Sequence, residues 1–568
     1  MEDLKDKLVR FIRNDSAAIN NQSTRQIREY KLVDNQTVIM LTLCDIDNKV
    51  AVIEGRGENW EVAVESALSL YKQSENDMSK GYKYLKLDVI NTVFPVKESG
   101  PLVDIRNDQV TYNRGIDGLA FGKHLDVIFL PEEVIMFKLI KDEQIQVFNL
   151  FETIKKHLSI KYTRDYLQKI KDSLELELYK INVDTYYVDN KGVRKLYRGH
   201  PIIDEVDEDL IMEAIKLTKN NYFGKIVNKK GKFIYSYLPW ENRKEKRYNI
   251  LRHAGTVLSM MEIYELLPDD KLLNDAELAL DFLLDKTVEF DMNSSHVAAV
   301  VEKDAIKLGG NALAIIALAK YTQVTGYLRY LPIMKKLAGY IKAVQNEEGL
   351  FTIHKQQYST GVVMDFVSHY YPGEAILALV RLYQLDKDET WLDVAESAAQ
   401  YLINVRDKEA DIHTIAHDHW LLYALNELYR ERSNKIYLDH SILIAKAIMR
   451  CQIKDDCDNP DWNGAYLFPW PRLESTPTAI RSEGLCAAYN LARDNGYDDE
   501  AKQMAEVIHE GIRFQLQTQV KPENVVFYKR KKLCLGAFQR GLYQYDLRID
   551  YTQHNISSLI AYYKILSN

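Results

Sequence analysis

The sequence is poor in cysteine and has no long apolar run, and both absences limit what the protein can be. Its 568 residues include five cysteines, an odd number, and no two of them form a Cys-x-x-Cys pair. Such scattered cysteines are typical of free thiols in a reducing compartment, so we expect a cytoplasmic protein. No apolar stretch reaches the length of about 18 residues that a membrane-spanning helix needs. The charged segment Met1–Asn14 lacks the apolar core of a secretion signal.

The chain also lacks any stripe of basic residues. Lysine and arginine total 74 against 82 aspartates and glutamates, and the two signs are mixed along the sequence. Nucleic acid is therefore not expected as a partner. A hydrophobic content of 46% is enough for real cores, and the length predicts at least two domains.

The first 200 residues have a mixed α/β pattern. Runs rich in β-branched and aromatic residues predict strands, at Thr37–Cys44, Lys49–Glu54, Tyr84–Val96 and Leu125–Leu130. Helical spacing predicts helices over residues 60–71, 142–158 and 163–179. We expect the polar segment Asn182–His200 to form the boundary, so that an α/β domain spans residues 1–200 and a second domain spans residues 201–568.

Two short elements of this part resemble the AMMECR-type α/β domain. Gly115-Ile116-Asp117-Gly118-Leu119 precedes Phe129-Leu130-Pro131-Glu132-Glu133-Val134, in the order that the family shows. The family's Gly-Cys-Ile-Gly element is missing, and Ile53-Glu54-Gly55-Arg56 stands roughly in its place. The resemblance implies an AMMECR-like domain over residues 20–160 without that family's active site. A generic α/β accessory domain is the alternative.

From Asp207 onward almost nothing has a strand pattern, and two kinds of helix alternate. Six are amphipathic, at Asp207–Asn220, Leu272–Val288, Tyr330–Gln345, Trp391–Val405, Tyr437–Gln452 and Asp499–Gln515. Six are apolar nearly all round, at Ala254–Leu266, Asn311–Tyr321, Glu374–Leu385, His419–Tyr429, Glu483–Ala492 and Asn555–Leu566. An amphipathic helix needs one wet face, whereas an apolar helix needs burial. This alternation predicts an all-α (α/α)6 toroid, and the uneven spacing of the repeats disfavours an open solenoid.

Each predicted inner helix begins with a cluster of polar residues, as in the stretch Arg247–Thr256. Helix N-termini carry partial positive charge and unpaired N–H groups, so six of them on one rim favour an anionic or polyhydroxyl ligand. The candidate catalytic residues are His253, Glu374, His419, Glu483, Tyr545 and Tyr551. The candidate substrate-binding residues are Arg252, Asn311, His369, Tyr371, Asp418, Trp420, Trp470, Arg481, Arg548 and His554. Trp470 lies in the aromatic loop Asp458–Thr478, which either stacks on a sugar or plugs the barrel.

The alternating helices resemble the six-hairpin glycosidase-like superfamily of glycoside hydrolases, polysaccharide lyases and sugar epimerases. A sharper likeness lies near the C-terminus, where Tyr545-Asp546-Leu547-Arg548 precedes Tyr551-Thr552-Gln553-His554-Asn555-Ile556. These two elements resemble the C-terminal region of glucuronyl C5-epimerases, although the interval between them is shorter here. The resemblance implies proton transfer by the two tyrosines and carboxylate binding by Arg548.

Three saccharide reactions remain open. A glycosidase needs a pair of carboxyl groups across the scissile bond, for which Glu374, Asp418, Glu483 and Asp550 are available. A uronate epimerase or lyase needs an acid, a base and a cation for the carboxylate. An N-acyl-hexosamine-type epimerase would use two histidines, such as His253 and His419. Arginines on three inner helices favour an anionic saccharide.

A saccharide-binding or scaffold protein without catalysis is the alternative to an enzyme, and a protein partner could bind through the N-terminal domain. We expect no cofactor and no metal. A lanthionine-cyclase-like toroid would need a Cys/Cys/His zinc set, and Cys486 stands alone in its helix. Metal binding by His413, His417 and His419 is an alternative, because residues i and i+4 share a helix face, but it fails if His417 only precedes the helix.

Overall fold

The computed structural model describes residues 36–45, 50–73, 83–96, 115–122, 124–141, 178–456, 459–467 and 473–567, with a few isolated positions before residue 150. The chain divides into two compact units near Ile202. Two short later segments, Trp240–Asn242 and Lys521–Lys532, belong to the first unit together with residues 1–202. The second unit holds the rest of the chain.

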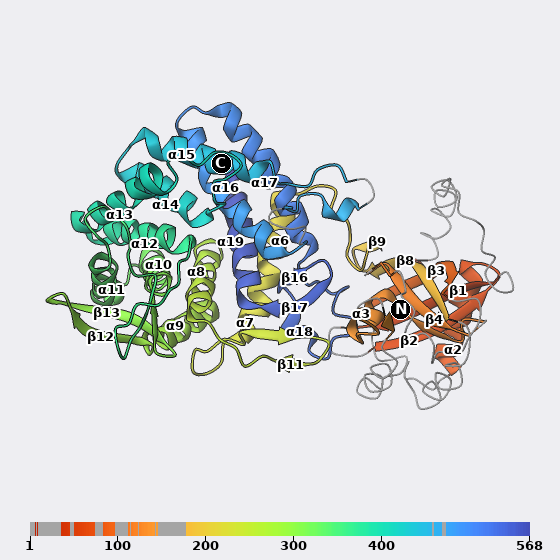
Figure 1. The fold of residues 1–568 in the computed structure, drawn as a ribbon. Coiled ribbons are helices and arrows are strands. Elements are labelled where there is room, and N and C mark those ends of the chain that lie inside the picture. The colour runs from red at the N-terminus through yellow and green to blue at the C-terminus, as the bar shows by residue number, and fades with distance from the viewer. Residues whose placement is uncertain are drawn as a thin grey trace. The chain divides into compact units, whose positions relative to one another are not determined.

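The first unit contains a seven-stranded antiparallel sheet in the order β2-β1-β3-β8-β4-β5, with β9 paired to β8 (Figure 1). The strands are β1 (Thr37–Cys44), β2 (Val50–Gly57), β3 (Tyr84–Pro95), β4 (Asp117–Phe121), β5 (Val127–Phe129), β8 (Leu178–Asp189) and β9 (Gly192–Leu196). The segment Asn182–His200, which the sequence predicted as a polar boundary, forms much of β8 and all of β9, and the division between the two units follows it near Ile202. The predicted helices over residues 142–158 and 163–179 fall almost wholly outside the described residues.

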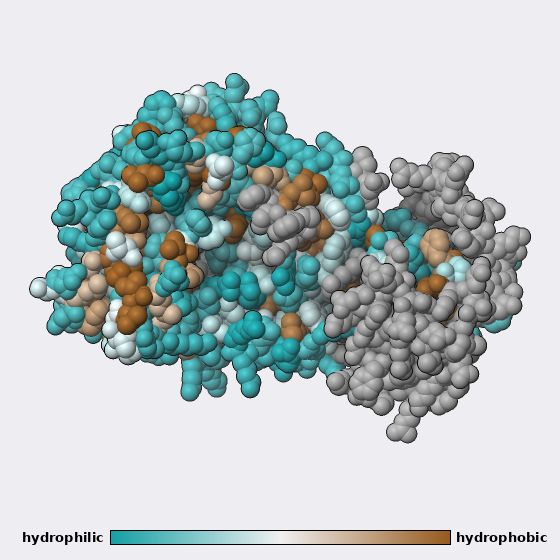
Figure 2. All heavy atoms as spheres, in the orientation of Figure 1, coloured by the Kyte–Doolittle hydropathy of each residue, from teal (hydrophilic) through white to brown (hydrophobic). Residues whose placement is uncertain are grey.

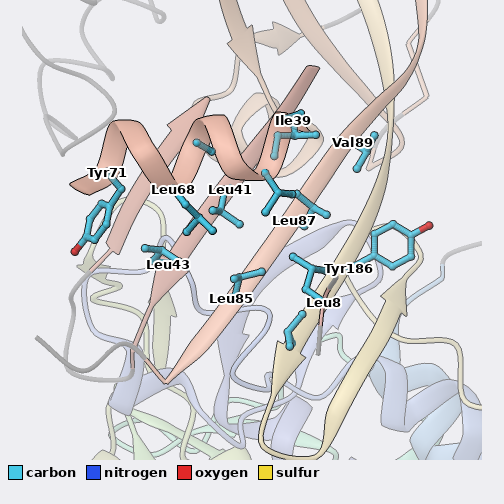
Figure 3. Close-up of a cluster of buried hydrophobic side chains, with 14 of the residues drawn as sticks. Leu8, Ile39, Leu41, Leu43, Leu68, Tyr71, Leu85, Leu87, Val89 and Tyr186 are labelled. Atoms are coloured by element: carbon cyan, nitrogen blue, oxygen red, sulfur yellow. The ribbon is translucent and has the colours of Figure 1, made fainter. Parts of the chain in front are cut away.

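Helix α2 (Trp60–Gln73) packs its apolar side against this sheet. Leu68 of α2 lies among Ile39, Leu41 and Leu87, which alternate along β1 and β3 and therefore share one face (Figure 3). Gly55 lets the helix come close, because a Cβ there would lie 2.1 Å from the carbonyl oxygen of Ala63. After β5 the chain enters helix α3 (Pro131–Met136). The AMMECR likeness of this part stays a prediction.

The second unit is built on six inner helices that form a closed ring. They are α8 (Ile250–Leu266), α10 (Leu308–Thr325), α12 (Tyr370–Asp386), α14 (His419–Glu431), α16 (Ser475–Asp494) and α19 (Ile549–Leu566), and they can be followed in Figure 1 from yellow-green to blue. Each packs against the next, and α19 packs against α8, which closes the ring. Every residue of α10 from Leu308 to Thr322 is buried, as the apolar pattern requires. The predicted (α/α)6 toroid is confirmed.

Six amphipathic helices surround the ring. They are α6 (Glu208–Leu217), α9 (Asp270–Leu284), α11 (Leu331–Ala343), α13 (Glu389–Tyr401), α15 (Lys435–Met449) and α17 (Asp498–Gln517). In α9 the buried residues Leu272, Ala276, Leu280 and Leu283 recur at helical spacing. The face of this unit seen in Figure 2 is mostly hydrophilic, with separate hydrophobic patches. Within the described ranges, no helix is long and apolar enough to cross a membrane.

Short strands also occur in this unit, although the sequence predicted almost none. One sheet has the order β12-β13-β14-β15, at Thr287–Met292, Ser295–Glu302, Ala305–Lys307 and Lys355–Gln357. Another has the order β11-β10-β17-β16, at Arg243–Lys244, Ser236–Leu238, Gln544–Arg548 and Gln539–Gly541. Strand β14 leads directly into α10, and β17 leads directly into α19. The sheets therefore fix the chain where two inner helices begin.

Candidate active site

The N-terminal halves of neighbouring inner helices touch, so the helices begin at the same end of the toroid. Small residues allow this close approach. A Cβ added at Gly309 of α10 would lie 2.2 Å from Glu374 Oε2 of α12. A Cβ at Gly484 of α16 would lie 3.0 Å from the His419 Cβ of α14. The polar residues predicted for these first turns are thereby brought onto one rim.

Glu374 stands in the first turn of α12 and is only 4% exposed. Its Oε2 atom has no hydrogen-bond partner among the described residues. Burial raises the pKa of Glu374 well above its usual range, and the charge of Asp418 raises it further. Both effects favour the protonated form of this side chain.

Asp418 caps the N-terminus of α14, where its Oδ1 accepts the backbone N–H of Leu421 at 3.1 Å. Its Oδ2 atom is buried and accepts no hydrogen bond within the part of the chain that the structure describes. Burial raises the pKa of Asp418 to about 7, although the bond from Leu421 lowers it. Glu374 and Asp418 thus form a buried carboxyl pair on adjacent inner helices, each with one oxygen left for a ligand.

His419, Glu483 and His554 lie together beside this pair and come from α14, α16 and α19. His554 Nδ1 is 3.0 Å from Glu483 Oε1, and the His419 and His554 rings stand 5.5 Å apart. His419 is 3% exposed, and neither of its ring nitrogens has a described hydrogen-bond partner. Burial lowers the pKa of His419 well below its usual range, so its ring is neutral. Burial raises the pKa of Glu483 to about 7, against the effect of His554.

A second group of side chains joins the first and last inner helices. Arg252 Nε of α8 lies 2.9 Å from Asp550 Oδ2, and Asp550 also accepts Arg548 Nη2 at 2.8 Å. The Arg548 guanidinium lies over the Tyr551 ring, 4.3 Å from its centroid. Arg252 also donates to Tyr235 Oη at 2.8 Å and keeps 39% of its side chain exposed. Arg252 and Arg548 share the single carboxylate of Asp550, so these three side chains together carry a net positive charge.

Arg481 lies in the second turn of α16 rather than at its start. The predicted helix began at Glu483, but α16 begins at Ser475. The guanidinium group donates to His417 Nδ1 at 3.3 Å and to the Pro477 carbonyl at 2.8 Å. It also raises the local positive potential, which lowers the pKa of His419.

His253 does not join these groups, contrary to the prediction that it is catalytic. It follows Arg252 by one residue, so its side chain points about 100° away around the helix. Its Nε2 is 2.8 Å from the carbonyl oxygen of Ala279 on the outer helix α9, and its Nδ1 is 2.7 Å from Tyr248 Oη. The ring is fully buried, and burial lowers its pKa to about 4. We therefore assign His253 a structural role.

Asn311 is also engaged in the fold instead of facing a ligand. It is fully buried, and its Oδ1 accepts the backbone N–H of Val300 at 2.8 Å. This bond ties α10 to β13. The corrected role of Asn311 is thus to hold the strand that precedes its helix.

The remaining candidates line the rim more loosely or lie outside it. Tyr371 packs on His354, and Trp420 packs on His419 with ring centroids 5.0 Å apart. His369 is exposed just before α12, and Tyr545 is half-buried in β17. Trp470 lies outside the described residues. His413 is exposed and does not join His417 and His419 in a ligand set, so the alternative metal site of the sequence is not formed.

Tyr370 belongs to the site but was not chosen from the sequence, and Asp550 was considered only as a carboxyl group for a glycosidase. The Tyr370 ring is 41% exposed and lies 5.6 Å from the His419 ring. The spacing from Tyr370 to Glu374 is four residues, one helical turn, and could have indicated a shared face. Nothing in the sequence pairs Asp550 with Arg252, because they are almost 300 residues apart.

An apolar loop leads into α12 next to Tyr370. Five of its side chains are between 39% and 74% exposed, namely Val362, Val363, Met364, Phe366 and Val367. Phe366 also packs against Tyr371, with ring centroids 5.8 Å apart. The loop thus places an exposed apolar surface beside the buried polar groups.

Residues 295–513 match one family model, described as the beta-L-arabinofuranosidase GH127 catalytic domain. The matched stretch is shorter than half of the chain but contains Glu374, Asp418, His419 and Glu483. No curated protein matches the chain.

The chain also resembles solved structures of low sequence identity. A D-mannose isomerase is 12% identical with a TM-score of 0.47, over 63% of this chain and 98% of that one. An unsaturated glucuronyl hydrolase specific for heparin is 15% identical with a TM-score of 0.45, over 64% of this chain and 99% of that one. A sugar epimerase from a ruminal bacterium is 17% identical with a TM-score of 0.41, over 53% of this chain and 87% of that one.

Proposed function

We propose that this carbohydrate-active enzyme of the six-hairpin glycosidase-like type hydrolyses a glycosidic bond, with Glu374 as general acid and Asp418 as nucleophile or base. That the protein is a saccharide-acting enzyme is confirmed by the family match over residues 295–513. The reaction is our proposal. It rests on one observation: two buried carboxyl groups on adjacent inner helices each keep an oxygen without a hydrogen-bond partner among the described residues.

The hydrogen bonds assign the two roles. Asp418 accepts an N–H at the start of α14, where the helix dipole favours a negative charge. Glu374 has no such donor at Oε2 among the described residues, and its burial together with the charge of Asp418 favours its protonated form. Glycoside hydrolysis needs this division, with one carboxylic acid for the leaving oxygen and one carboxylate for the sugar or the water.

The test is hydrolysis of a panel of aryl glycosides and oligosaccharides, including β-L-arabinofuranosides and uronides. We expect Glu374→Gln to lose about 10³-fold in kcat on a disaccharide but much less on a nitrophenyl glycoside. A leaving group that needs no proton bypasses the acid. Asp418→Asn should lose activity on both substrates. The exposed Glu347→Gln is the matched control. Unchanged activity of both site variants, or no hydrolysis of any glycoside, would reject the proposal.

A second candidate is a sugar epimerase, and it is favoured by the His419 ring, whose nitrogens have no hydrogen-bond partner within the described part of the chain. His419 and His554 stand side by side with a neutral ring on His419. Two such groups can remove and return a proton on a sugar carbon. Incubation of reducing sugars in D2O would incorporate deuterium at the epimerised carbon if this reaction occurs. Hydrolysis of a glycoside without deuterium exchange would reject the epimerase and support the glycoside hydrolase.

The proposed hydrolase acts on a substrate with an acidic group, which binds at Arg252. The support is the excess of guanidinium over carboxylate around Asp550 and the partial exposure of Arg252. We expect Arg252→Gln to raise KM for a uronide about tenfold while leaving KM for the matching neutral glycoside almost unchanged. An equal change for both substrates would reject the acidic substituent.

For the compartment we propose the cytoplasm, supported by Cys44, Cys451 and Cys486, none of which forms a disulfide bond among the described residues. For the first unit we propose an AMMECR-like accessory role that recruits a protein partner. Its support is the order β4, β5, α3, which places Gly118 and Pro131 as the resemblance implies. Cell fractionation would test the compartment, and affinity purification with the full chain would test the recruitment of a protein partner.

A further inference from the structure

We propose that His419, Glu483 and His554 bind one divalent transition-metal ion, with zinc as the best fit. The three residues come from the three inner helices α14, α16 and α19. One ligand atom from each can be chosen so that all lie within 4.8 Å of one another. The inference concerns metal binding itself and does not depend on which saccharide reaction the enzyme performs.

The donor set is what points to zinc. Two imidazole nitrogens and one carboxylate oxygen are ligands of Zn²⁺ and related ions, whereas Mg²⁺ and Ca²⁺ prefer oxygen alone. Ligand atoms around a tetrahedral zinc stand about 3.3 Å apart. His554 Nδ1 and Glu483 Oε1 are 3.0 Å apart, so two of the three ligand atoms already stand close to that spacing, and the third lies within 4.8 Å of both.

A bound cation would satisfy groups that the described protein leaves unsatisfied. His419 is buried with both ring nitrogens lacking a hydrogen-bond partner among the described residues, which costs free energy in the absence of a ligand. Two buried carboxyl groups can carry negative charge here, namely Glu483 of the ligand set and Asp418, which precedes His419 in the chain. Arg481 acts electrostatically on His419, and its guanidinium is engaged with His417 and Pro477. A divalent ion would offset the negative charge of the ionised carboxylates.

The surroundings hold the ligands in position before any ion arrives. Trp420 and Tyr370 pack on the His419 ring at 5.0 Å and 5.6 Å between centroids. Gln553 Nε2 lies 3.3 Å from His554 Nδ1, the same nitrogen that faces Glu483, so a bound ion would take the place of this contact. The His419 ring is thus positioned by aromatic packing, and the His554 ring by its contact with Glu483.

Three protein ligands leave the fourth tetrahedral position open. In enzymes that position holds a water or a substrate oxygen, as opposed to the closed four-ligand sites that only stabilise a fold. The site therefore belongs to the substrate end of the toroid, beside Glu374 and Asp418. A sugar hydroxyl at the open position would be oriented towards that carboxyl pair.

The experiment is metal titration of the full chain after dialysis against EDTA. We expect one equivalent of Zn²⁺ by calorimetry and elemental analysis, a rise in melting temperature with Zn²⁺, and no rise with Mg²⁺. His419→Gln and Glu483→Gln should weaken binding by on the order of 100-fold or more. His296→Gln is the matched control, because His296 is an exposed histidine held by the carboxylates of Glu289 and Asp291. That variant should bind Zn²⁺ as the unchanged protein does.

The proposal is overturned if the unchanged protein binds no Zn²⁺, or if the site variants bind it as well as His296→Gln does. Should the site variants not fold, the X-ray absorption spectrum of the Zn²⁺-loaded unchanged protein decides. Two imidazoles and oxygen donors would support the site, whereas sulfur donors or oxygen alone would reject it. If no metal binds, the His419 ring is left for proton transfer, as the epimerase candidate requires.

Discussion

Arg252 on the first inner helix and Asp550 on the last form an ion pair of 2.9 Å that joins the two ends of the ring. Asp550 is 3% exposed and binds Arg548 as well, so one buried carboxylate holds two guanidinium groups. The pair closes the toroid between segments that are far apart in the chain, and it does so at the end where the site lies.

We predict that Asp550→Asn lowers the free energy of unfolding by about 3 kcal/mol, because it leaves two cations beside a buried amide. Because Arg252 is partly exposed, the expected decrease in unfolding free energy is at the lower end of the range for breaking a buried ion pair. Urea denaturation of the full chain measures it. Asp291→Asn is the control, since Asp291 pairs with His296 but is 84% exposed and should change stability by less than about 0.5 kcal/mol. Equal midpoints for the two variants would contradict the ring-closing role.

Adjacent glycines at the start of α10 give a second prediction. A Cβ at Gly309 would lie 2.2 Å from Glu374 Oε2 and 2.4 Å from the Tyr371 ring, whereas a Cβ at Gly310 meets nothing nearer than Leu251 at 3.5 Å. Gly309→Ala should therefore displace Glu374 and lower kcat by about tenfold or more. Gly310→Ala should keep activity and stabilise the helix by up to about 1 kcal/mol. Kinetics and thermal unfolding of both variants make the comparison, and full activity of Gly309→Ala would show that this contact does not position the acid.

The toroid could be predicted from the sequence because burial leaves a pattern. Inner helices such as α10 are apolar all round, outer helices such as α9 are amphipathic, and the alternation of the two requires a double ring. The predicted saccharide-acting enzyme followed from that architecture and is confirmed. The rim residues were predicted from the polar clusters at the starts of the buried helices, because such a cluster needs a partner or a ligand.

The details of the site depend on rotation around each helix and on close packing, and neither has a local signal. Arg252 and His253 are neighbours in the sequence, yet one faces Asp550 and the other faces α9. The sequence predicted that this inner helix begins at Glu483, eight residues after the true start of α16 at Ser475. Pro477 stands in the first turn of α16, where a helix tolerates proline. The likeness of Tyr545 and Tyr551 to epimerase residues stays a prediction. Tyr551 donates weakly to Asp546 at 3.4 Å and lies under Arg548.

The burial of His253 predicts a loss of stability in mild acid. Its pKa is lowered from 6.5 to about 4 in the folded protein, since the buried ring is held neutral. Above pH 6.5 the ring is neutral in both states, so there is no effect. As the pH falls from 6.5 to 4, the unfolded chain takes up a proton that the folded chain does not, and stability falls by about 3 kcal/mol.

Urea denaturation between pH 4 and pH 7 tests this for the unchanged protein and for His253→Gln. The variant should be less stable at pH 7 but should lose about 3 kcal/mol less on acidification. His296→Gln is the control of opposite sign. Hydrogen bonds to Asp291 and Glu289 raise the pKa of His296, so the stability it contributes is present in acid and is lost as the pH rises. Parallel pH profiles for the unchanged protein and His253→Gln would show that this histidine is not buried as a neutral ring.

The segment Lys521–Lys532 decides how the toroid can be produced alone. In the sequence the segment falls between residues of the toroid, but in the structure it belongs to the first unit. There Lys531 Nζ donates to the Asp45 carbonyl, and Phe527 packs in a core with Ile128 and Ile181. Residues on either side of it are paired, since Gly536 donates its N–H to the Val520 carbonyl.

We therefore predict that residues 203–568 fold alone only when residues 521–532 are replaced by a short Gly-Ser turn. With the native segment, removal of residues 1–202 uncovers Val525, Val526 and Tyr528, which are buried in the full chain, and exposed apolar patches promote aggregation. Size-exclusion chromatography and thermal unfolding compare the two truncated chains. A monomeric, cooperatively melting product from the turn-replaced chain, next to aggregates from the other, is the expected result. If both are insoluble, the toroid needs the first unit in order to fold, and the two units are not independent.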